Sequence, residues 1–179
     1  HDALPIFDHG HITSIQTVDQ PTCEPTRIES TRLQIPLAKS RHELGLRLML
    51  DFVPNHMGLG HPWVESHPEH FVRGTELDLA RAPQNYVWVK RKAGDMLFAY
   101  GRDPYFAGWP DTLQLNYGKP ELQQAMIGEL ERIAGQCDGL RCDMAMLVLP
   151  DVFQSTWGIT APLFWPQATA SVRGKYPDF

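Results

Sequence analysis

The stretch Gly139-Leu140-Arg141-Cys142-Asp143-Met144-Ala145 decides the fold, and an earlier stretch, Asp51-Phe52-Val53-Pro54-Asn55-His56, has to be considered with it. In each, a short apolar run meets side chains that can donate or accept hydrogen bonds. The apolar run at residues 46–50 leads into Asp51, and the run at residues 137–142 leads into Asp143. Short apolar runs separated by a segment of helical periodicity are typical of parallel strands in α/β folds.

Two aspartates fall at the carboxyl ends of these predicted strands, where α/β folds carry out their chemistry. They are Asp51 and Asp143. Arg141 precedes Asp143 by two residues, so we expect both side chains on the same face of one strand. A guanidinium beside a carboxylate keeps the carboxylate ionised and oriented, which suits a nucleophile.

Both stretches resemble signatures of one enzyme family. Asp-Phe-Val-Pro-Asn-His resembles the first signature of the α-amylase superfamily of glycoside hydrolases (family 13), and Gly-Leu-Arg-Cys-Asp-Met-Ala resembles its Gly-x-Arg-x-Asp segment. The resemblance covers residues 45–179. It implies an α/β fold, namely a partial (β/α)8 TIM barrel with an inserted loop subdomain after the third strand. A whole barrel needs about 250 residues, so a chain of 179 residues is expected to hold a fragment of the catalytic domain.

The domain boundaries follow from this resemblance. Residues 1–41 form a poorly readable N-terminal segment, and residues 1–6 resemble the translation of a sequencing adapter, so we leave them out of the fold prediction. Residues 42–179 are the barrel fragment, and residues 58–118 are its inserted loop subdomain.

Four local elements are predicted from pattern. Residues 86–90 and 96–100 flank a turn and predict a hairpin. Helical periodicity predicts a helix from Pro120 that ends near Gly135. Residues 144–158 are expected to form a loop, and residues 161–175 a second outer helix.

The resemblance also implies a role for each candidate site residue. Retaining glycosidases use two carboxyl groups about 5 Å apart. Asp143 would be the nucleophile, Arg141 would keep it ionised and aimed, His56 would bind a sugar hydroxyl, and Asp51 would support the site. The family's general acid is a glutamate after the next strand, and no glutamate in this chain matches that motif. We therefore expect this chain alone to be inactive in hydrolysis.

Calcium is a candidate cofactor that the sequence does not favour, and we predict no cofactor. By resemblance, Asn55 corresponds to a calcium-binding position of many α-amylases, but Gln114 replaces an expected aspartate ligand. We expect Asn55 to bond to loop backbone instead. His61, His67 and His70 have irregular spacing, so we interpret them as loop-packing or solvated histidines and predict no metal site.

Five aromatic residues of the predicted subdomain could stack on sugar rings, although most are expected to form its core. They are Trp63, Trp88, Tyr105, Phe106 and Trp109.

Composition excludes several partners. A net charge of −5 with mixed signs argues against nucleic acid and anionic membranes. No apolar run approaches the length of a membrane helix, about 20 residues, and a cytoplasmic location is the default. Of the three cysteines, Cys137 and Cys142 are expected to be buried thiols. The expected partner is an α-glucan or α-glucoside.

The sequence admits three interpretations of function. The favoured one is a retaining α-glucoside hydrolase or transglycosylase that acts through a covalent glycosyl-aspartate intermediate. The alternative is a non-catalytic amylase-like domain that binds sugar or protein, although retention of Asp143, Arg141 and His56 disfavours it. A nucleotide-binding α/β enzyme is excluded because the chain has no glycine-rich phosphate loop. Without the resemblance, Arg141 and Asp143 would be interpreted as a structural ion pair.

Overall fold

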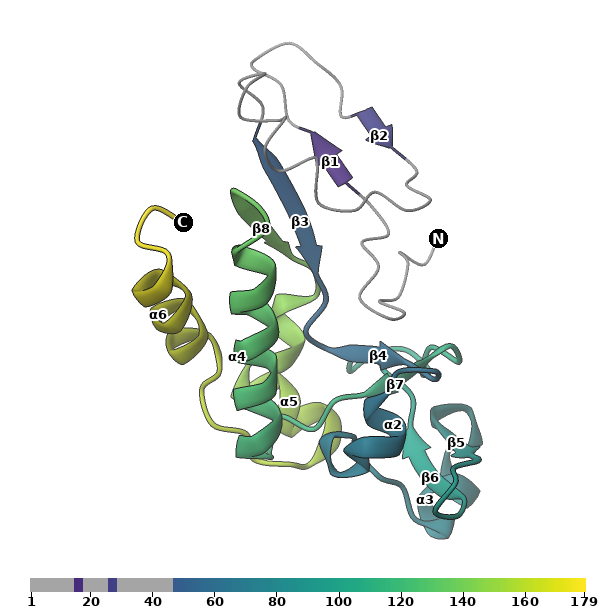
Figure 1. The fold of residues 1–179 in the computed structure, drawn as a ribbon. Coiled ribbons are helices and arrows are strands. Elements are labelled where there is room, and N and C mark those ends of the chain that lie inside the picture. The colour runs from purple at the N-terminus through teal and green to yellow at the C-terminus, as the bar shows by residue number, and fades with distance from the viewer. Residues whose placement is uncertain (1–14, 18–25, 29–46) are drawn as a thin grey trace. The chain divides into compact units, whose positions relative to one another are not determined.

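The structure, a computed structural model, describes residues 15–17, 26–28 and 47–179 (Figure 1). The chain divides into two compact units. The first contains the described residues of His1–Phe52, Met126–Asp143 and Trp165–Phe179, and the second contains Val53–Ala125 and Met144–Phe164. The predicted adapter-like start lies outside the described residues.

The first unit is built on a pair of parallel strands, as the sequence predicted. They are β3 (Leu48–Phe52) and β8 (Gly139–Cys142), and their register places Leu50 beside Leu140. Burial alternates along β3, because Leu48, Leu50 and Phe52 are buried whereas the residues between them are more exposed. One face of this strand therefore packs in the core, and the other is available for polar side chains. The α/β class is confirmed.

Two short strands extend this sheet in the order β2-β1-β3-β8. They are β1 (Ile15–Thr17) and β2 (Thr26–Ile28), and β1 pairs antiparallel with both β2 and β3. This arrangement departs from the parallel neighbour that a (β/α)8 barrel would place beside β3. Pairing with β1 satisfies backbone groups on an edge of β3 that would otherwise be open.

Two helices accompany the sheet. The first, α4 (Pro120–Ala134), agrees with the helix predicted from Pro120, and its residues from Met126 onward belong to the first unit. The second, α6 (Trp165–Lys175), begins four residues later than predicted. Glu131 of α4 joins them, since it accepts hydrogen bonds from Ser171 and Lys175 of α6. In the described part of the chain, no helix is long and apolar enough to span a membrane.

The second unit contains two antiparallel strand pairs. The predicted hairpin is confirmed as β5 (Tyr86–Val89) and β6 (Met96–Ala99). The other pair joins β4 (His56–Gly58) to β7 (Thr112–Gln114). Its short helices are α2 (Trp63–Ser66), η1 (Pro68–His70), α3 (Glu76–Arg81) and η2 (Pro83–Asn85). The predicted subdomain, residues 58–118, falls within this unit, and its boundaries stay a prediction.

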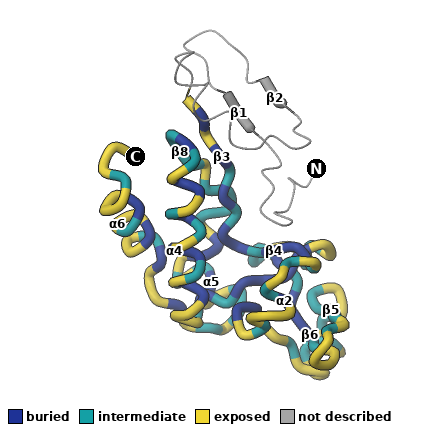
Figure 2. The backbone as a smooth tube through the Cα atoms, viewed as in Figure 1, coloured by how far each residue is buried: buried dark blue, intermediate teal, exposed yellow. Residues whose placement is uncertain are grey.

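The core of the second unit is aromatic and aliphatic, but three of the five aromatic residues named in the sequence analysis are exposed and lie outside it. Phe71 and Phe98 meet edge to face and are fully buried. By contrast, Tyr105 and Phe106 are 86% and 72% exposed, and Trp88 is exposed as well. The expectation that most of the five aromatics form the core is therefore wrong. Figure 2 shows how burial is distributed along the backbone.

The prediction of a loop at residues 144–158 is also wrong. This segment forms η3 (Ala145–Val148) and α5 (Pro150–Trp157). Pro150 begins α5 at a position where its missing N–H costs nothing, and Gly158 ends it in the left-handed conformation with φ 67°. Phe153 anchors the helix in the core, where its ring meets that of Tyr117. The helix therefore had clear start and stop signals in the sequence.

Candidate active site

Three of the four predicted site residues come together on the exposed face of the parallel strand pair. Asp51 lies in β3 and is in register with Arg141 of β8. Asp143 follows β8 directly and is two residues from Arg141, so all three side chains share one face of the sheet. The backbone ladder continues as far as Asp143, whose N–H donates to the Phe52 carbonyl at 2.9 Å.

Arg141 links the two carboxylates. Its Nη2 donates to Asp143 Oδ1 at 3.0 Å, and its Nη1 donates to Asp51 Oδ1 at 3.3 Å. The two aspartate side chains are more buried than the arginine, at 17% and 23% exposed against 42%. One guanidinium therefore fixes the orientation of two carboxylates that belong to different strands.

The contact with Arg141 uses only one oxygen of Asp143. Among the described residues, Oδ2 of Asp143 accepts no hydrogen bond. Arg141 therefore orients the carboxylate of Asp143 through Oδ1 alone. Its neighbour Cys142 points to the opposite face and is half-buried, and burial raises the pKa of its thiol. Cys137 is buried, as predicted.

The residue after Asp143 has an uncommon backbone conformation. Met144 has φ 56° and ψ 27°, which is the left-handed region. Among the described residues it is the only non-glycine with positive φ, and this conformation costs an L-residue about 1–2 kcal/mol. It ends the extended conformation of β8 and starts η3. Such strain is concentrated at functional sites, and this one adjoins the predicted nucleophile.

His56, the fourth predicted site residue, lies in the second unit. It begins β4, where it is in register with Gln114 of β7. Its ring centroid lies 5.3 Å from that of Trp109, with the planes tilted by 56°. Asn55 Nδ2 lies 3.4 Å from His56 Nδ1. The backbone of Gly101 passes beside His56 so closely that a Cβ at this position would come within 2.8 Å of the His56 Cβ.

The contacts of His56 with Trp109 and Gly101 were missed in the sequence, because they join positions far apart in the chain. Gly101 forms an isolated bridge with Trp109, whose N–H donates to the Gly101 carbonyl at 2.8 Å. The Gly101 N–H in turn donates to the Thr112 hydroxyl at 3.0 Å. His56 is thus held by a glycine that gives it room and by an aromatic ring that packs against it.

The environment of Asn55 does not fit a calcium ion. Asn55 and Gln114 are both fully buried. Gln114 Nε2 donates to Asn55 Oδ1 at 3.0 Å, to the Asn55 carbonyl at 2.9 Å and to the Leu115 carbonyl at 3.1 Å. An amide donor therefore engages the oxygens that a hard cation would need as ligands. The Asn55 side chain bonds to the side chains of Gln114 in β7 and His56 in β4, so the expectation that it bonds to loop backbone is wrong.

One of three comparisons with known proteins, the search of solved structures, agrees with the family resemblance. No protein-family model matches the sequence, and no curated protein matches it. Among solved structures, an α-amylase from Lactobacillus plantarum is 30% identical with a TM-score of 0.53, over 79% of this chain and 25% of that one. A maltogenic α-amylase from Thermotoga neapolitana is 24% identical with a TM-score of 0.47, over 75% of this chain and 24% of that one. An α-amylase from H. orenii is 22% identical with a TM-score of 0.48, over 77% and 28%.

The chain thus spans about a quarter of the length of these structures. The structural match to the Lactobacillus plantarum enzyme and the two sequence motifs point to the same family. Together they confirm the resemblance to the α-amylase superfamily of glycoside hydrolases.

Proposed function

We propose that the chain is part of a retaining α-glucoside hydrolase or transglycosylase in which Asp143 forms the covalent glycosyl-enzyme intermediate. The observation that supports this most directly is the bridge from Arg141 to both Asp51 and Asp143, at the ends of two adjacent parallel strands. The resemblance to α-amylases supplies the reaction class, because a structural ion pair alone would not.

In the proposed reaction, Asp143 attacks the anomeric carbon of an α-glucoside through Oδ2. The bond between that oxygen and the anomeric carbon forms as the bond to the leaving oxygen breaks. Arg141 holds Oδ1 at 3.0 Å and so restrains rotation of the carboxylate. Asp51 holds the other side of the same guanidinium. Such positioning lowers the entropy that must be lost in the transition state.

Two further steps need a proton donor and an acceptor. The leaving oxygen takes a proton from the general acid, which the resemblance to α-amylases implies is a glutamate after the next strand. Water in a hydrolase, or a sugar hydroxyl in a transglycosylase, then attacks the anomeric carbon, the bond to Asp143 Oδ2 breaks, and the deprotonated glutamate takes the proton of the attacking group. His56 is proposed to donate a hydrogen bond to a sugar hydroxyl, with Trp109 and Gly101 fixing its ring.

A substrate whose leaving group needs no protonation tests the nucleophile separately from the general acid. We expect the 179-residue chain to react with α-glucosyl fluoride and to gain one hexosyl group on the peptide that contains Asp143, as measured by mass spectrometry. Methyl α-glucoside should give no product, because its leaving oxygen must be protonated.

The matched controls are two aspartate variants. Asp143→Asn should abolish labelling, whereas Asp151→Asn, at an exposed position in the first turn of α5, should leave it unchanged. Labelling that persists in Asp143→Asn would show that another group is the nucleophile. An unlabelled chain that still binds maltotriose by calorimetry would favour the non-catalytic sugar-binding domain.

A further inference from the structure

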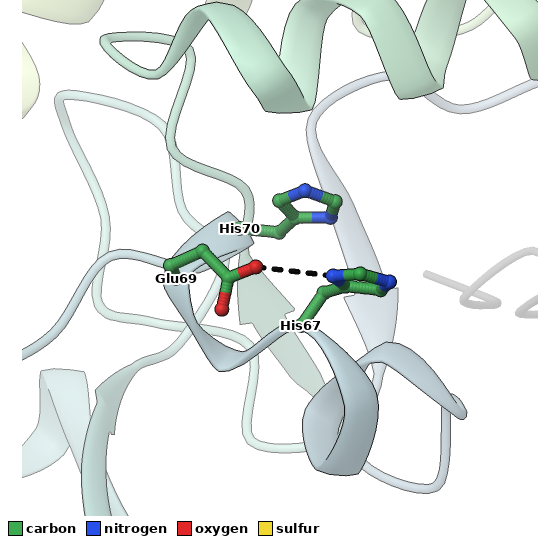
Figure 3. A group of neighbouring side chains, drawn as sticks. All are labelled: His67, Glu69 and His70. Carbon is green, nitrogen blue, oxygen red and sulfur yellow. Dashed lines mark hydrogen bonds and ion pairs between the residues drawn. The ribbon is translucent and has the colours of Figure 1, made fainter.

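Three potential metal ligands gather at one turn of the second unit, and none of them takes part in the proposed carbohydrate chemistry. They are His67, Glu69 and His70 (Figure 3). One ligand atom from each lies within 4.8 Å of the others. We propose that these residues form a binding site for a divalent transition-metal ion, with zinc as the ion that the ligand set fits best. We therefore set aside the interpretation of these histidines as loop-packing or solvated residues.

The turn itself brings the two histidines together. Pro68 begins the 3-10 helix η1, and the His70 N–H donates to the His67 carbonyl at 3.0 Å. In a 3-10 turn the side chains at positions i and i+3 are eclipsed. The two imidazole rings accordingly stack with centroids 4.9 Å apart and planes 14° from parallel. The spacing His-x-x-His thus becomes a pair of neighbouring ligands only because the chain adopts this tight turn.

His70 is the fixed member of the group. It is 5% exposed, its ring meets Trp63 edge to face at 5.0 Å, and its carbonyl accepts a hydrogen bond from Asn116 N at 2.8 Å. Its buried Nδ1 has no hydrogen-bond partner among the described residues. A buried nitrogen without a partner costs about 1–3 kcal/mol, and coordination of a metal ion would use its lone pair.

His67 and Glu69 are the adjustable members. Their side chains are 51% and 52% exposed, and Glu69 Oε1 lies 3.0 Å from His67 Nδ1. Ligand atoms around a tetrahedral zinc ion lie about 3.3 Å apart, so the present separation must shorten. Two stacked rings cannot aim both lone pairs at one point, so His67 has to turn. Both exposed side chains can rotate toward His70 without disturbing the core.

The ligand types favour a transition metal over calcium or magnesium. Two imidazoles and one carboxylate form a donor set that zinc uses with a fourth position left to water. Calcium and magnesium require several oxygen ligands, and this group offers one carboxylate. Among the described residues no cysteine belongs to the group.

Calorimetric titration of the metal-free 179-residue chain with zinc chloride tests the site. We expect the wild-type chain to bind zinc and not magnesium at this site. The variants His67→Gln and Glu69→Gln each remove one exposed ligand and leave the buried His70 in place. Since outer-shell partners alone change metal affinity by about 10- to 100-fold, each variant should raise the zinc Kd by at least about tenfold. Substitution by cobalt gives a second measurement, because visible absorption bands report nitrogen and oxygen ligands in a low-coordinate site.

The control variant is Glu76→Gln, which changes an exposed glutamate in the first turn of α3 and should leave zinc affinity unchanged. If zinc bound instead to histidines outside the described residues, neither His67→Gln nor Glu69→Gln would change the zinc affinity. Wild-type affinity in either variant would therefore overturn the three-ligand site, and so would absence of zinc binding by the wild-type chain.

Discussion

Gly101 lies against His56 so closely that neither residue can change independently of the other. A Cβ built on Gly101 would approach the His56 Cβ at 2.8 Å, the His56 Cγ at 3.0 Å and the Thr112 hydroxyl at 2.8 Å. The absence of a side chain at position 101 therefore determines where the His56 ring lies, and the ring is the part that is proposed to contact sugar.

The variant Gly101→Ala is expected to displace the His56 ring and to lower the free energy of unfolding. A separation of 2.8 Å is shorter than packed side chains tolerate. Overpacking of this kind lowers the free energy of unfolding by about 1–3 kcal/mol. Urea denaturation measures the loss, and the NMR signals of the His56 ring report its displacement.

The control for this variant is Gly128→Ala in α4, where an added Cβ would meet nothing within 4 Å. Because glycine in a helix interior is less favourable than alanine, this variant should raise the free energy of unfolding by about 0.5–1 kcal/mol. If Gly101→Ala were also neutral or stabilising and left the His56 signals in place, the close approach would not constrain the ring.

Removal of Arg141 is expected to destabilise the first unit mainly through Asp51 and Asp143. The variant Arg141→Gln leaves two carboxylates of like charge on neighbouring strands. Since the arginine side chain is 42% exposed, the loss in unfolding free energy should be modest, about 1 kcal/mol.

A double-mutant cycle with Asp143→Asn measures the interaction directly. The coupling should be about 0.5 kcal/mol and should shrink at high salt. Strictly additive effects of Arg141→Gln and Asp143→Asn would show that the hydrogen bond between them contributes nothing to stability.

The packing of α6 against α4 is expected to depend on pH through Glu131. Hydrogen bonds from Ser171 and then Lys175 lower the pKa of Glu131 below the ordinary 4.5. A depressed pKa in the folded state contributes stability that is fully present above the unfolded value and is lost as pH falls through the folded value. The stability difference between wild type and Glu131→Gln should therefore be largest near neutral pH and disappear in strong acid.

Denaturation curves measured from neutral to strongly acidic pH test this dependence. Ser171→Ala removes the larger of the two causes of the lowered Glu131 pKa, the hydrogen bond from Ser171. In this background, the stability change caused by Glu131→Gln should depend less on pH. A difference between wild type and Glu131→Gln that stayed constant across the acid range would contradict the assignment.

Replacement of Gln114 by leucine is expected to destabilise the second unit. Gln114 is fully buried, and its Nε2 donates to two oxygens of Asn55 and one of Leu115. Leucine is of similar size but leaves Asn55 Oδ1 without this donor, at a cost of about 1–3 kcal/mol. Thermal unfolding measures the change. An unchanged transition would mean that the amide does not hold this part of the core together.

The contact of Arg141 with Asp143 could be predicted from the sequence because it rests on short-range rules. Apolar runs predicted the two strands, a two-residue spacing put Arg141 and Asp143 on one face, and the helix from Pro120 supplied the parallel connection. The hydrogen bond from Arg141 to Asp51 was not predicted, because it depends on the register of β3 against β8. The resemblance to α-amylases supplied the chemical roles.

The features that sequence analysis missed depend on contacts between distant segments or on signals that were present but not used. The packing of Trp109 on His56 follows from the folding of the whole second unit, and no local pattern predicts it. The helix α5 did have its signals, with Pro150 at its start and Gly158 at its end. The three apolar residues between them were too few to show a clear helical period.

The last hydrogen bond of the parallel ladder, from Asp143 N to Phe52 O, ties the position of the carboxylate to the strand that precedes it in the chain. Phe52 is 3% exposed, so its own position is fixed by the interior of the first unit. Directed evolution of such an enzyme would then be expected to find rate-changing substitutions among hydrophobic residues of β3 that never meet a sugar. If Asp143 is the nucleophile, as proposed, its orientation would be improved by repacking the buried residues of β3.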